Sequence, residues 1–263
     1  TQASEMPLPW GRAAAVGLAL ALAVDLALCS GPAEPRRQGF SGRDGNGTYV
    51  GTIAGNGRPG SADGLSDRSR LNLPMGVDIS PDGLLIAVAD YGNHKVRTLS
   101  MPAGGWLSAA GVEMATLSGN GVQGFRNGPA AGAQFYFPSD AKVSPDQTWV
   151  AVADRGNDVI RKVMLSTGET STLAGKGVAG YVDGHSTNAM FKGPVSVAFT
   201  AAGDGLVIAD QDNHRIRYIN ITGNITFTLA GPRILRSACA WGRYRPQGAC
   251  PDGRCQCGDP TSL

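Results

Sequence analysis

Polar residues that could do chemistry recur three times in the middle of the chain, in the pattern Ala-Asp-x-x-Asn-[His/Asp]-x-[Val/Ile]-Arg. The set comprises Asp90, Asn93, His94 and Arg97; Asp154, Asn157 and Arg161; and Asp210, Asn213, His214 and Arg217. A ring of such carboxylates could bind a cation, and the arginines could bind an acidic ligand or RNA phosphates. Because every copy lies beside the same repeated turn, structural roles are favoured instead.

Each aspartate is therefore predicted to accept hydrogen bonds from backbone amides of the turn that carries the asparagine. Each arginine is expected to pair with a nearby carboxylate, and His94 and His214 to be packed or hydrogen-bonded at a turn. The unrepeated His185 is expected to be solvated in a loop. Since the chain also has no G-x-S-x-G or H-E-x-x-H motif, we assign no catalytic residue, no metal ligand and no cofactor.

Three glycine-rich segments match the dinucleotide fingerprint G-x-G-x-x-G, beginning at Gly55, Gly119 and Gly175. That chemistry needs a helix N-terminus behind the glycines, whereas turn formers such as Asp63-Gly64 follow here. The segments are thus predicted to be loops. A formal net charge of +2 provides no basic field for RNA or DNA, so no nucleic-acid partner is expected.

The elements that position these residues are short strands. Within one unit, Val77 and Ile79 alternate with polar neighbours, residues 84–89 form an apolar run, residues 95–100 alternate again, and residues 114–117 close the unit. The Thr-[Ile/Leu]-[Ala/Ser]-Gly segments that mark the outermost strand end at Gly55, Gly119, Gly175 and Gly231. Four antiparallel strands at a fixed period describe a blade of a β-propeller, and 38 glycines with 16 prolines fit many tight turns.

The repeated signature and the Thr-Leu-Ala-Gly strand ends closely resemble NHL-repeat propellers over residues 48–232, with Asp158 standing where the family has histidine. The resemblance implies an all-β, NHL-type β-propeller, and the family usually has six blades. The chain supplies three four-stranded blades plus one extra outer strand at residues 52–55. We therefore expect an open arc, which is either a fragment of a six-blade ring or completes the ring by self-association of two copies.

The remaining segments predict a secretory route. Residues 13–28 are apolar apart from Asp25, which indicates an N-terminal apolar helix that is a signal peptide, a membrane anchor or a buried helix. The expected organisation is a signal peptide or anchor at 1–33, a linker at 34–47, propeller blades at 48–233 and a cysteine-rich tail at 234–263. The protein is expected to be secreted or membrane-associated, with residues 13–28 as its membrane contact.

Cysteine and asparagine patterns agree with that compartment. Two disulfides of undetermined pairing are predicted among Cys239, Cys250, Cys255 and Cys257, because the tail has no histidine and no paired C-x-x-C for zinc. The candidate glycosylation sites are Asn46, Asn220 and Asn224.

A repeated scaffold without a distinct catalytic constellation favours a non-catalytic interaction platform that binds a protein or glycan. The alternative is an extracellular enzyme, a metal-dependent lyase or lactonase-like hydrolase of the kinds that the family resemblance includes, with its remaining blades missing.

Overall fold

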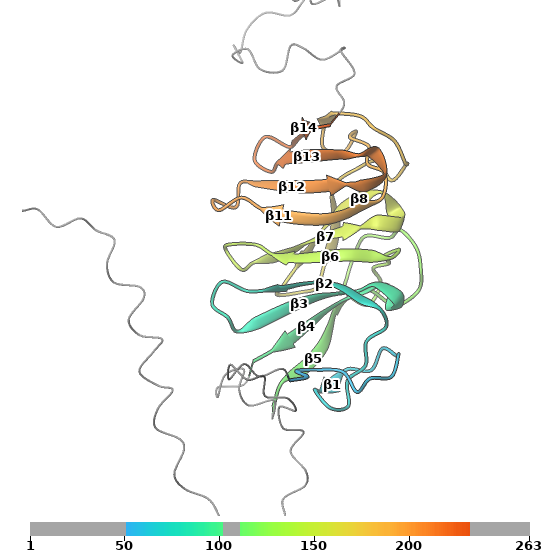
Figure 1. Ribbon diagram of the computed structural model, residues 1–263, viewed down its shortest axis with the longest axis vertical. Coiled ribbons are helices and arrows are strands. Elements are labelled where there is room, and N and C mark those ends of the chain that lie inside the picture. The colour runs from blue at the N-terminus through green and yellow to red at the C-terminus, as the bar shows by residue number, and fades with distance from the viewer. Residues whose placement is uncertain (1–50, 102–110, 232–263) are drawn as a thin grey trace, which may run out of the picture. The chain divides into compact units, whose positions relative to one another are not determined.

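A computed structural model of the chain describes residues 51–101 and 111–231 as three antiparallel sheets that follow one another along the chain (Figure 1). Blade 1 consists of β1 (Gly64–Leu65), β2 (Pro74–Ile79), β3 (Leu85–Asp90), β4 (Lys95–Ser100) and β5 (Glu113–Ser118). Blade 2 consists of β6 (Pro138–Val143), β7 (Trp149–Asp154), β8 (Val159–Met164) and β9 (Thr170–Ala174). Blade 3 consists of β10 (Gly184–His185), β11 (Pro194–Phe199), β12 (Gly205–Asp210), β13 (Arg215–Asn220) and β14 (Ile225–Ala230). The predicted all-β class and the four long strands of each unit are confirmed.

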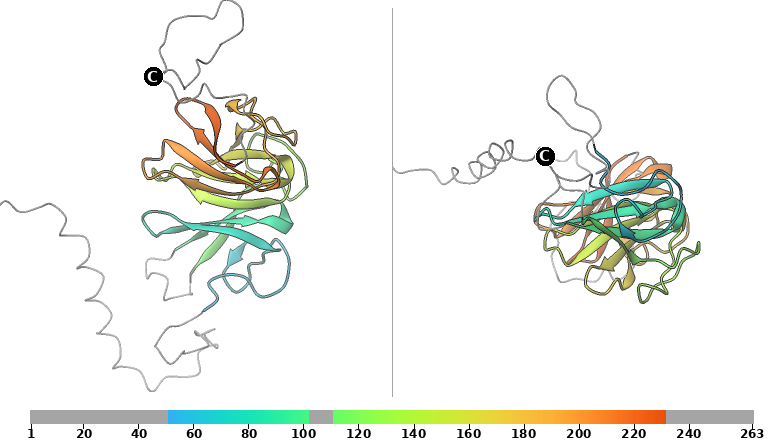
Figure 2. Two further views of the ribbon diagram at one scale, coloured as in Figure 1. Left: turned by 45° about the horizontal axis from the view of Figure 1, so that its top comes forward. Right: turned by 90° about the horizontal axis from the view of Figure 1, so that it is seen from below.

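The blades pack face to face as in a β-propeller. Their first long strands, β2, β6 and β11, lie side by side (Figures 1 and 2). The middle strand β7 is buried along its whole length, as its apolar sequence requires. Between blades 1 and 2, Ala87 and Ala89 of β3 pack with Ala141 and Val143 of β6, and an equivalent cluster joins blades 2 and 3. The core is thus a set of apolar layers between successive blades.

Residues 52–55 do not form the extra outer strand that the repeat predicted. The short strand β1 adds to the outer edge of blade 1, where Gly64 at a φ of 118° opposes Met114 of β5, as β10 adds to β14 in blade 3. The amide of Gly55 donates to the backbone oxygen of Ser66, a bond that recurs from Gly175 to Ser186 in the next repeat but one. The equivalents of this segment lie in β5 and β14, which pair with β4 and β13 of their own blades, and the described residues hold no such partner strand for residues 52–55.

Each blade opens with an unusual backbone conformation just before a proline. Leu73, Phe137 and Gly193 precede Pro74, Pro138 and Pro194 and have φ values of 50°, 53° and 56°. The left-handed region costs a residue with a Cβ atom about 1–2 kcal/mol. Such a conformation persists only where contacts with the surrounding structure stabilise it.

Several predicted features lie outside the described residues: the segments 1–33, 34–47 and 234–263, including the apolar helix, Asn46 and the cysteines of the tail. In residues 51–101 and 111–231, no helix is long and apolar enough to span a membrane.

Candidate functional site

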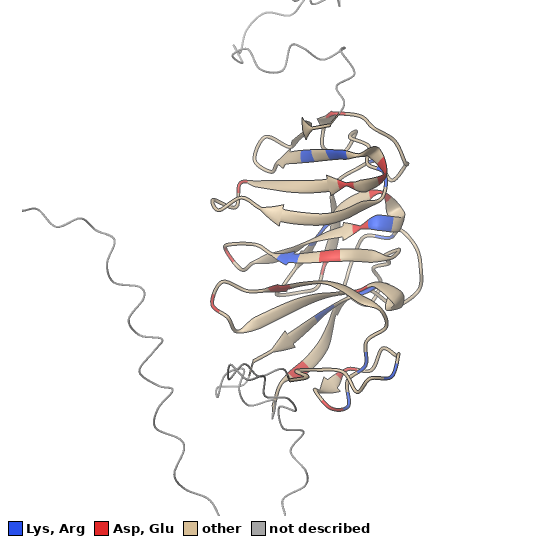
Figure 3. Ribbon diagram, in the orientation of Figure 1, with Lys and Arg blue, Asp and Glu red and all other residues tan. Residues whose placement is uncertain are grey.

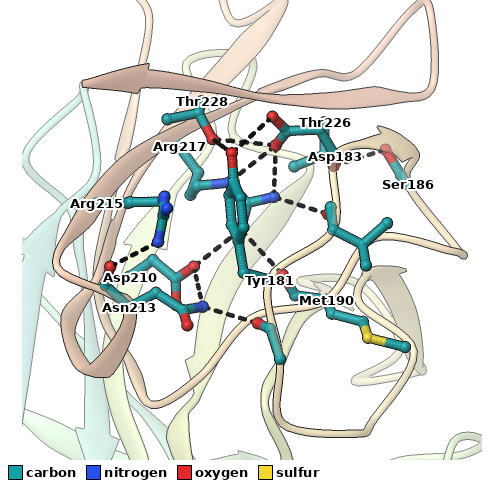
Figure 4. Close-up of polar contacts among 12 residues, drawn as sticks. Tyr181, Asp183, Ser186, Met190, Asp210, Asn213, Arg215, Arg217, Thr226 and Thr228 are labelled. Atoms are coloured by element: carbon teal, nitrogen blue, oxygen red, sulfur yellow. Dashed lines mark hydrogen bonds and ion pairs between the residues drawn. The ribbon is translucent and has the colours of Figure 1, made fainter. Parts of the chain in front are cut away.

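The repeated polar residues form one network in each blade, drawn for blade 3 in Figure 4. The Oδ1 atom of Asp210 accepts a hydrogen bond of 2.8 Å from the amide of Lys192, and its Oδ2 atom accepts from Asn213 and Arg217, each at 2.8 Å. The side chains of Asp210 and Arg217 are fully buried. A buried ion pair of this kind is stable only while both partners and their hydrogen bonds are present.

Blades 1 and 2 repeat the network. Asp90 accepts from the amide of Asn72 at 2.8 Å, from Asn93 at 2.7 Å and from Arg97 at 2.8 Å. Asp154 accepts from the amide of Tyr136 at 2.8 Å, from Asn157 at 2.8 Å and from Arg161 at 2.7 Å. The prediction that these amides belong to the turn with the asparagine is therefore wrong, because in all three blades the amide donor precedes the first long strand. The turn is held by the asparagine side chain instead.

Each signature arginine also binds the glycine-rich loop of its blade. Arg217 donates to the carbonyl of Val182 at 2.8 Å and to the carboxylate of Asp183 at 2.7 Å (Figure 4). Its guanidinium lies over the rings of Tyr181 and Phe191, each at 5.0 Å. Because Arg97, Arg161 and Arg217 are fully buried, their guanidinium groups are engaged inside the blades and face no solvent.

Blade 2 differs in the charge around its arginine. Asn127 accepts from Arg161 at 2.7 Å at the position where blades 1 and 3 have Asp63 and Asp183. Burial raises the pKa of Asp154 to about 6, against the opposing effects of Arg161, Asn157 and the amide of Tyr136. Asp154 is thus the one carboxylate bonded to the Arg161 guanidinium among the described residues.

Successive blades are joined by what we call the junction bond, from the amide before the proline of one blade to a turn side chain of the preceding blade. At junction 1–2, the amide of Phe137 donates to Nδ1 of His94 at 3.1 Å. At junction 2–3, the amide of Gly193 donates to Oδ1 of Asp158 at 2.8 Å. The departure of Asp158 from the repeat is therefore a change of acceptor, with the hydrogen bond retained.

Junction 1–2 is filled by aromatic rings. Phe137 stacks on Tyr91 with centroids 4.6 Å apart, and it lies 4.8 Å from both His94 and Tyr136. Burial lowers the pKa of His94, which keeps its Nδ1 atom free to accept the junction bond.

Junction 2–3 contains a pocket of about 310 Å³. Its lining combines aromatic rings, two cations and two carboxylates. The residues are Tyr136, Phe137, Arg155, Gly156, Asp158, Ala179, Lys192, Gly193 and Asp212. Burial, followed by repulsion from Asp210 and Asp212, raises the pKa of Asp158, while the amide of Gly193 and the charge of Lys192 oppose that shift. Acidic and basic residues lie together at the right-hand end of β7, beside this junction (Figure 3).

Other candidate residues lie apart from the pocket. His185 is exposed, but it lies in strand β10 and not in the predicted loop, and it contacts Thr187 at 2.9 Å and Asn224 at 3.1 Å. Asn224 is exposed, whereas Asn220 is half-buried and accepts from the amide of Gly223. Within residues 51–101 and 111–231, no three histidine, cysteine or acidic side chains gather in a way that could hold a metal ion.

Sequence reasoning missed the pocket because its charged residues are not repeated. Arg155 occupies the position of Tyr91 in blade 1, and Lys192 that of Asn72. Asp212 replaces the glycine found at 92 and 156. The available signal was variation at sites that flank an otherwise constant turn.

No family model matches the chain. Over 193 residues, 72% of its length, the chain is 26% identical to NHL repeat-containing protein 2 of Bos taurus, and it covers 25% of that protein. Over 148 residues, 56% of its length, it is 30% identical to Protein SUPPRESSOR OF QUENCHING 1, chloroplastic, of Arabidopsis thaliana, and it covers 14% of that protein. The chain thus spans a quarter or less of these curated relatives.

Among solved structures, an auxiliary nutrient binding protein from Bacteroides ovatus superposes with a TM-score of 0.52 at 20% sequence identity, covering 69% of this chain and 41% of that one. At this identity the superposition concerns the fold alone. The threefold repeat, the blade geometry and the similarity to the bovine NHL-repeat protein together support an NHL-repeat β-propeller family for this chain.

Proposed function

We propose that this propeller is a non-catalytic interaction platform, and that it binds a protein ligand in the pocket at junction 2–3. The observation that carries the proposal is the combination of Arg155 and Lys192 with Asp158 and Asp212 against an aromatic wall. Arg155, Lys192 and Asp212 do not belong to the repeated signature, whose aspartate, asparagine and arginine side chains are hydrogen-bonded within each blade.

The size of the pocket supports a side chain or a short loop as the ligand. A volume of about 310 Å³ is at the low end for sites that enclose small molecules. It suits the insertion of one or two anchoring side chains, which commonly supply most of the binding energy of a protein interface.

The charges support a protein ligand over a neutral glycan. A peptide segment with both an acidic and a basic side chain can pair with Lys192 and Asp212 at once, whereas a neutral sugar carries no charge for either. The ring of Phe137 adds an apolar wall.

We place this platform in the secretory pathway on the sequence alone. The apolar segment 13–28 and the four cysteines of the tail support that location, and Asn224 is exposed in a sequon that a glycan can reach.

The test is selection of a random 12-residue peptide display library on the full chain, followed by calorimetric titration of the selected peptides. We expect peptides with both charge signs, and a loss of affinity of tenfold or more in the double variant Lys192→Met/Asp212→Asn. The control is Arg58→Met/Glu113→Gln, which removes the same charges from exposed positions in blade 1 and should bind as the wild type does.

Peptides that bind both variants equally well would contradict the pocket as the site. Binding on a glycan array without any peptide binder would replace the protein ligand with a sugar. Stoichiometric metal together with lyase or hydrolase activity would favour the enzyme alternative.

A further inference from the structure

The two ends of the blade row carry the separate halves of a third junction bond. The donors of the two formed bonds, Phe137 and Gly193, have their counterpart in Leu73 at the start of blade 1. Leu73 has the same left-handed backbone, with a φ of 50°. The acceptors, His94 and Asp158, have their counterpart in His214. In residues 51–101 and 111–231, the amide of Leu73 has no hydrogen-bond acceptor and the imidazole of His214 has no hydrogen-bond partner.

The leading face of blade 1 is apolar and exposed. Met75, Val77 and Ile79 of β2 are 55%, 54% and 53% exposed. The residues equivalent to Val77 in the other blades are Ala141 and Val197, and both are buried against the preceding blade. Blade 1 therefore exposes the surface that blades 2 and 3 bury.

The trailing face of blade 3, which corresponds to the faces by which blades 1 and 2 pack on the next blade, is also apolar and exposed. Ile216 and Leu229 are 39% and 45% exposed. The residues equivalent to Ile216, Val96 and Ile160, are fully buried against the next blade. Within residues 51–101 and 111–231, the two outer faces of the three blades are thus equivalent to the two surfaces that pack on each other at both internal junctions.

We propose that two copies of this chain pair head to tail, with the trailing face of blade 3 of each copy on the leading face of blade 1 of the other. Each contact continues the interface already formed at junctions 1–2 and 2–3, including a junction bond from the amide of Leu73 to His214. Two such contacts close a ring of six blades, a number within the range in which propellers close. The two faces differ, so the contact is heterologous and a twofold axis makes it occur twice.

This inference goes beyond the proposed function, because the pocket at junction 2–3 lies within one chain and does not depend on pairing.

Sedimentation velocity on the full chain tests the proposal. We expect a species of twice the 27.1 kDa chain mass at micromolar concentration, and conversion to monomer by Val77→Asp. The control is Val178→Asp, which places the same charge on a 53% exposed valine of a loop and should remain dimeric. A wild-type protein that stays monomeric at 100 μM, with an ordinary β-sheet circular dichroism spectrum, would overturn the proposal.

Mixing two variants tests the head-to-tail arrangement. Val77→Asp damages the leading face and Ile216→Asp damages the trailing face, so each variant alone should be monomeric. Their mixture retains one undamaged contact and should form a heterodimer. If only one of the two substitutions abolishes pairing, like faces are in contact and the head-to-tail arrangement is wrong.

Milder variants keep the test valid if the charged ones fail to fold. His214→Asp supplies the acceptor that Asp158 provides at junction 2–3 and should preserve the dimer. His214→Leu removes one junction bond from each of the two contacts and should raise the dimer dissociation constant about 30-fold, the effect of two hydrogen bonds worth about 1 kcal/mol each. Equal dissociation constants for the two variants would contradict the third junction bond.

Discussion

Junctions 1–2 and 2–3 are built on the same backbone hydrogen bond and differ in almost everything around it. At the first, Phe137 donates to a histidine and its ring stacks on Tyr91. At the second, Gly193 donates to an aspartate and carries no side chain, and a charged pocket lies beside it. The repeat therefore preserves a donor and an acceptor, while the side chains at the same positions decide whether the junction is closed by aromatic rings or left open.

Blade 2 borders both junctions, so disruption of its polar network should have the largest effect on the free energy of unfolding. Asp154→Ala removes the carboxylate and leaves the guanidinium of Arg161 buried without its ion-pair partner. We expect the free energy of unfolding in urea to fall by about 3–5 kcal/mol. The control Glu169→Ala, at an exposed position, should change it by less than about 0.5 kcal/mol. A loss below about 1 kcal/mol for Asp154→Ala would show that the network does not hold the blade together.

Filling junction 2–3 with an aromatic ring should remove the difference between the two junctions. Gly193→Phe introduces at junction 2–3 the residue that junction 1–2 has, at a φ of 56° close to the 53° of Phe137. Its Cβ atom would lie 2.6 Å from Oδ2 of Asp212, so the Asp212 side chain has to move. We expect a stability cost of about 1–2 kcal/mol from the left-handed backbone and loss of peptide binding by calorimetry. Phe137→Gly is the reverse change. Undiminished binding in Gly193→Phe would mean that the ligand lies elsewhere.

Removal of one junction bond should have a smaller effect. Asp158→Ala leaves the amide of the buried Gly193 without an acceptor, and we expect the free energy of unfolding to fall by about 1 kcal/mol. His94→Ala should cost more, because the ring contacts with Phe137 are lost as well. Asp158→Asn keeps an acceptor and serves as the control, so an equal loss in Asp158→Asn would indicate that the charge matters more than the bond.

The smallest expected effect is a difference in how the two acceptors, His94 and Asp158, make the free energy of unfolding depend on pH. Burial lowers the folded-state pKa of His94 below the value of about 6.5 that a free histidine has. The unfolded chain therefore binds more protons, and the stability contributed by neutral His94 is present above about pH 6.5 and is lost as the pH falls toward the folded-state pKa. His94→Asp should abolish this part of the loss between pH 7 and 5 in urea titrations. An unchanged pH profile would rule out His94 as its source.

The fold was largely predictable because the blade signals are local. Alternation at Val77 and Ile79 and the apolar run before Asp90 each lie within one strand, and their recurrence identifies the blade. The failure at residues 52–55 has a tertiary cause, since a strand sequence needs a partner strand, as β5 and β14 have in β4 and β13. The partners of Asp90 were only partly predictable, because the amide of Asn72 lies 18 residues away along the chain.

The pocket could not be predicted from the repeats. Lys192 and Asp212 become neighbours only when the segments around Pro194 and η3 (Gln211–Asn213) are folded together. In the sequence, Asp158 is a departure from the repeat, because the sequence does not show that a carboxylate oxygen accepts the hydrogen bond from the next blade. Its oxygen and the Nδ1 atom of His94 are interchangeable acceptors.

The most direct test of this equivalence is the nitrogen NMR spectrum of the His94 imidazole, assigned by comparison with His94→Asp. A backbone amide can only donate, so Nδ1 must carry a lone pair and the proton must be on Nε2. The account predicts an unprotonated Nδ1 with a titration midpoint below about 6.5. A proton on Nδ1 at neutral pH, or a midpoint above that of a free histidine, would contradict it.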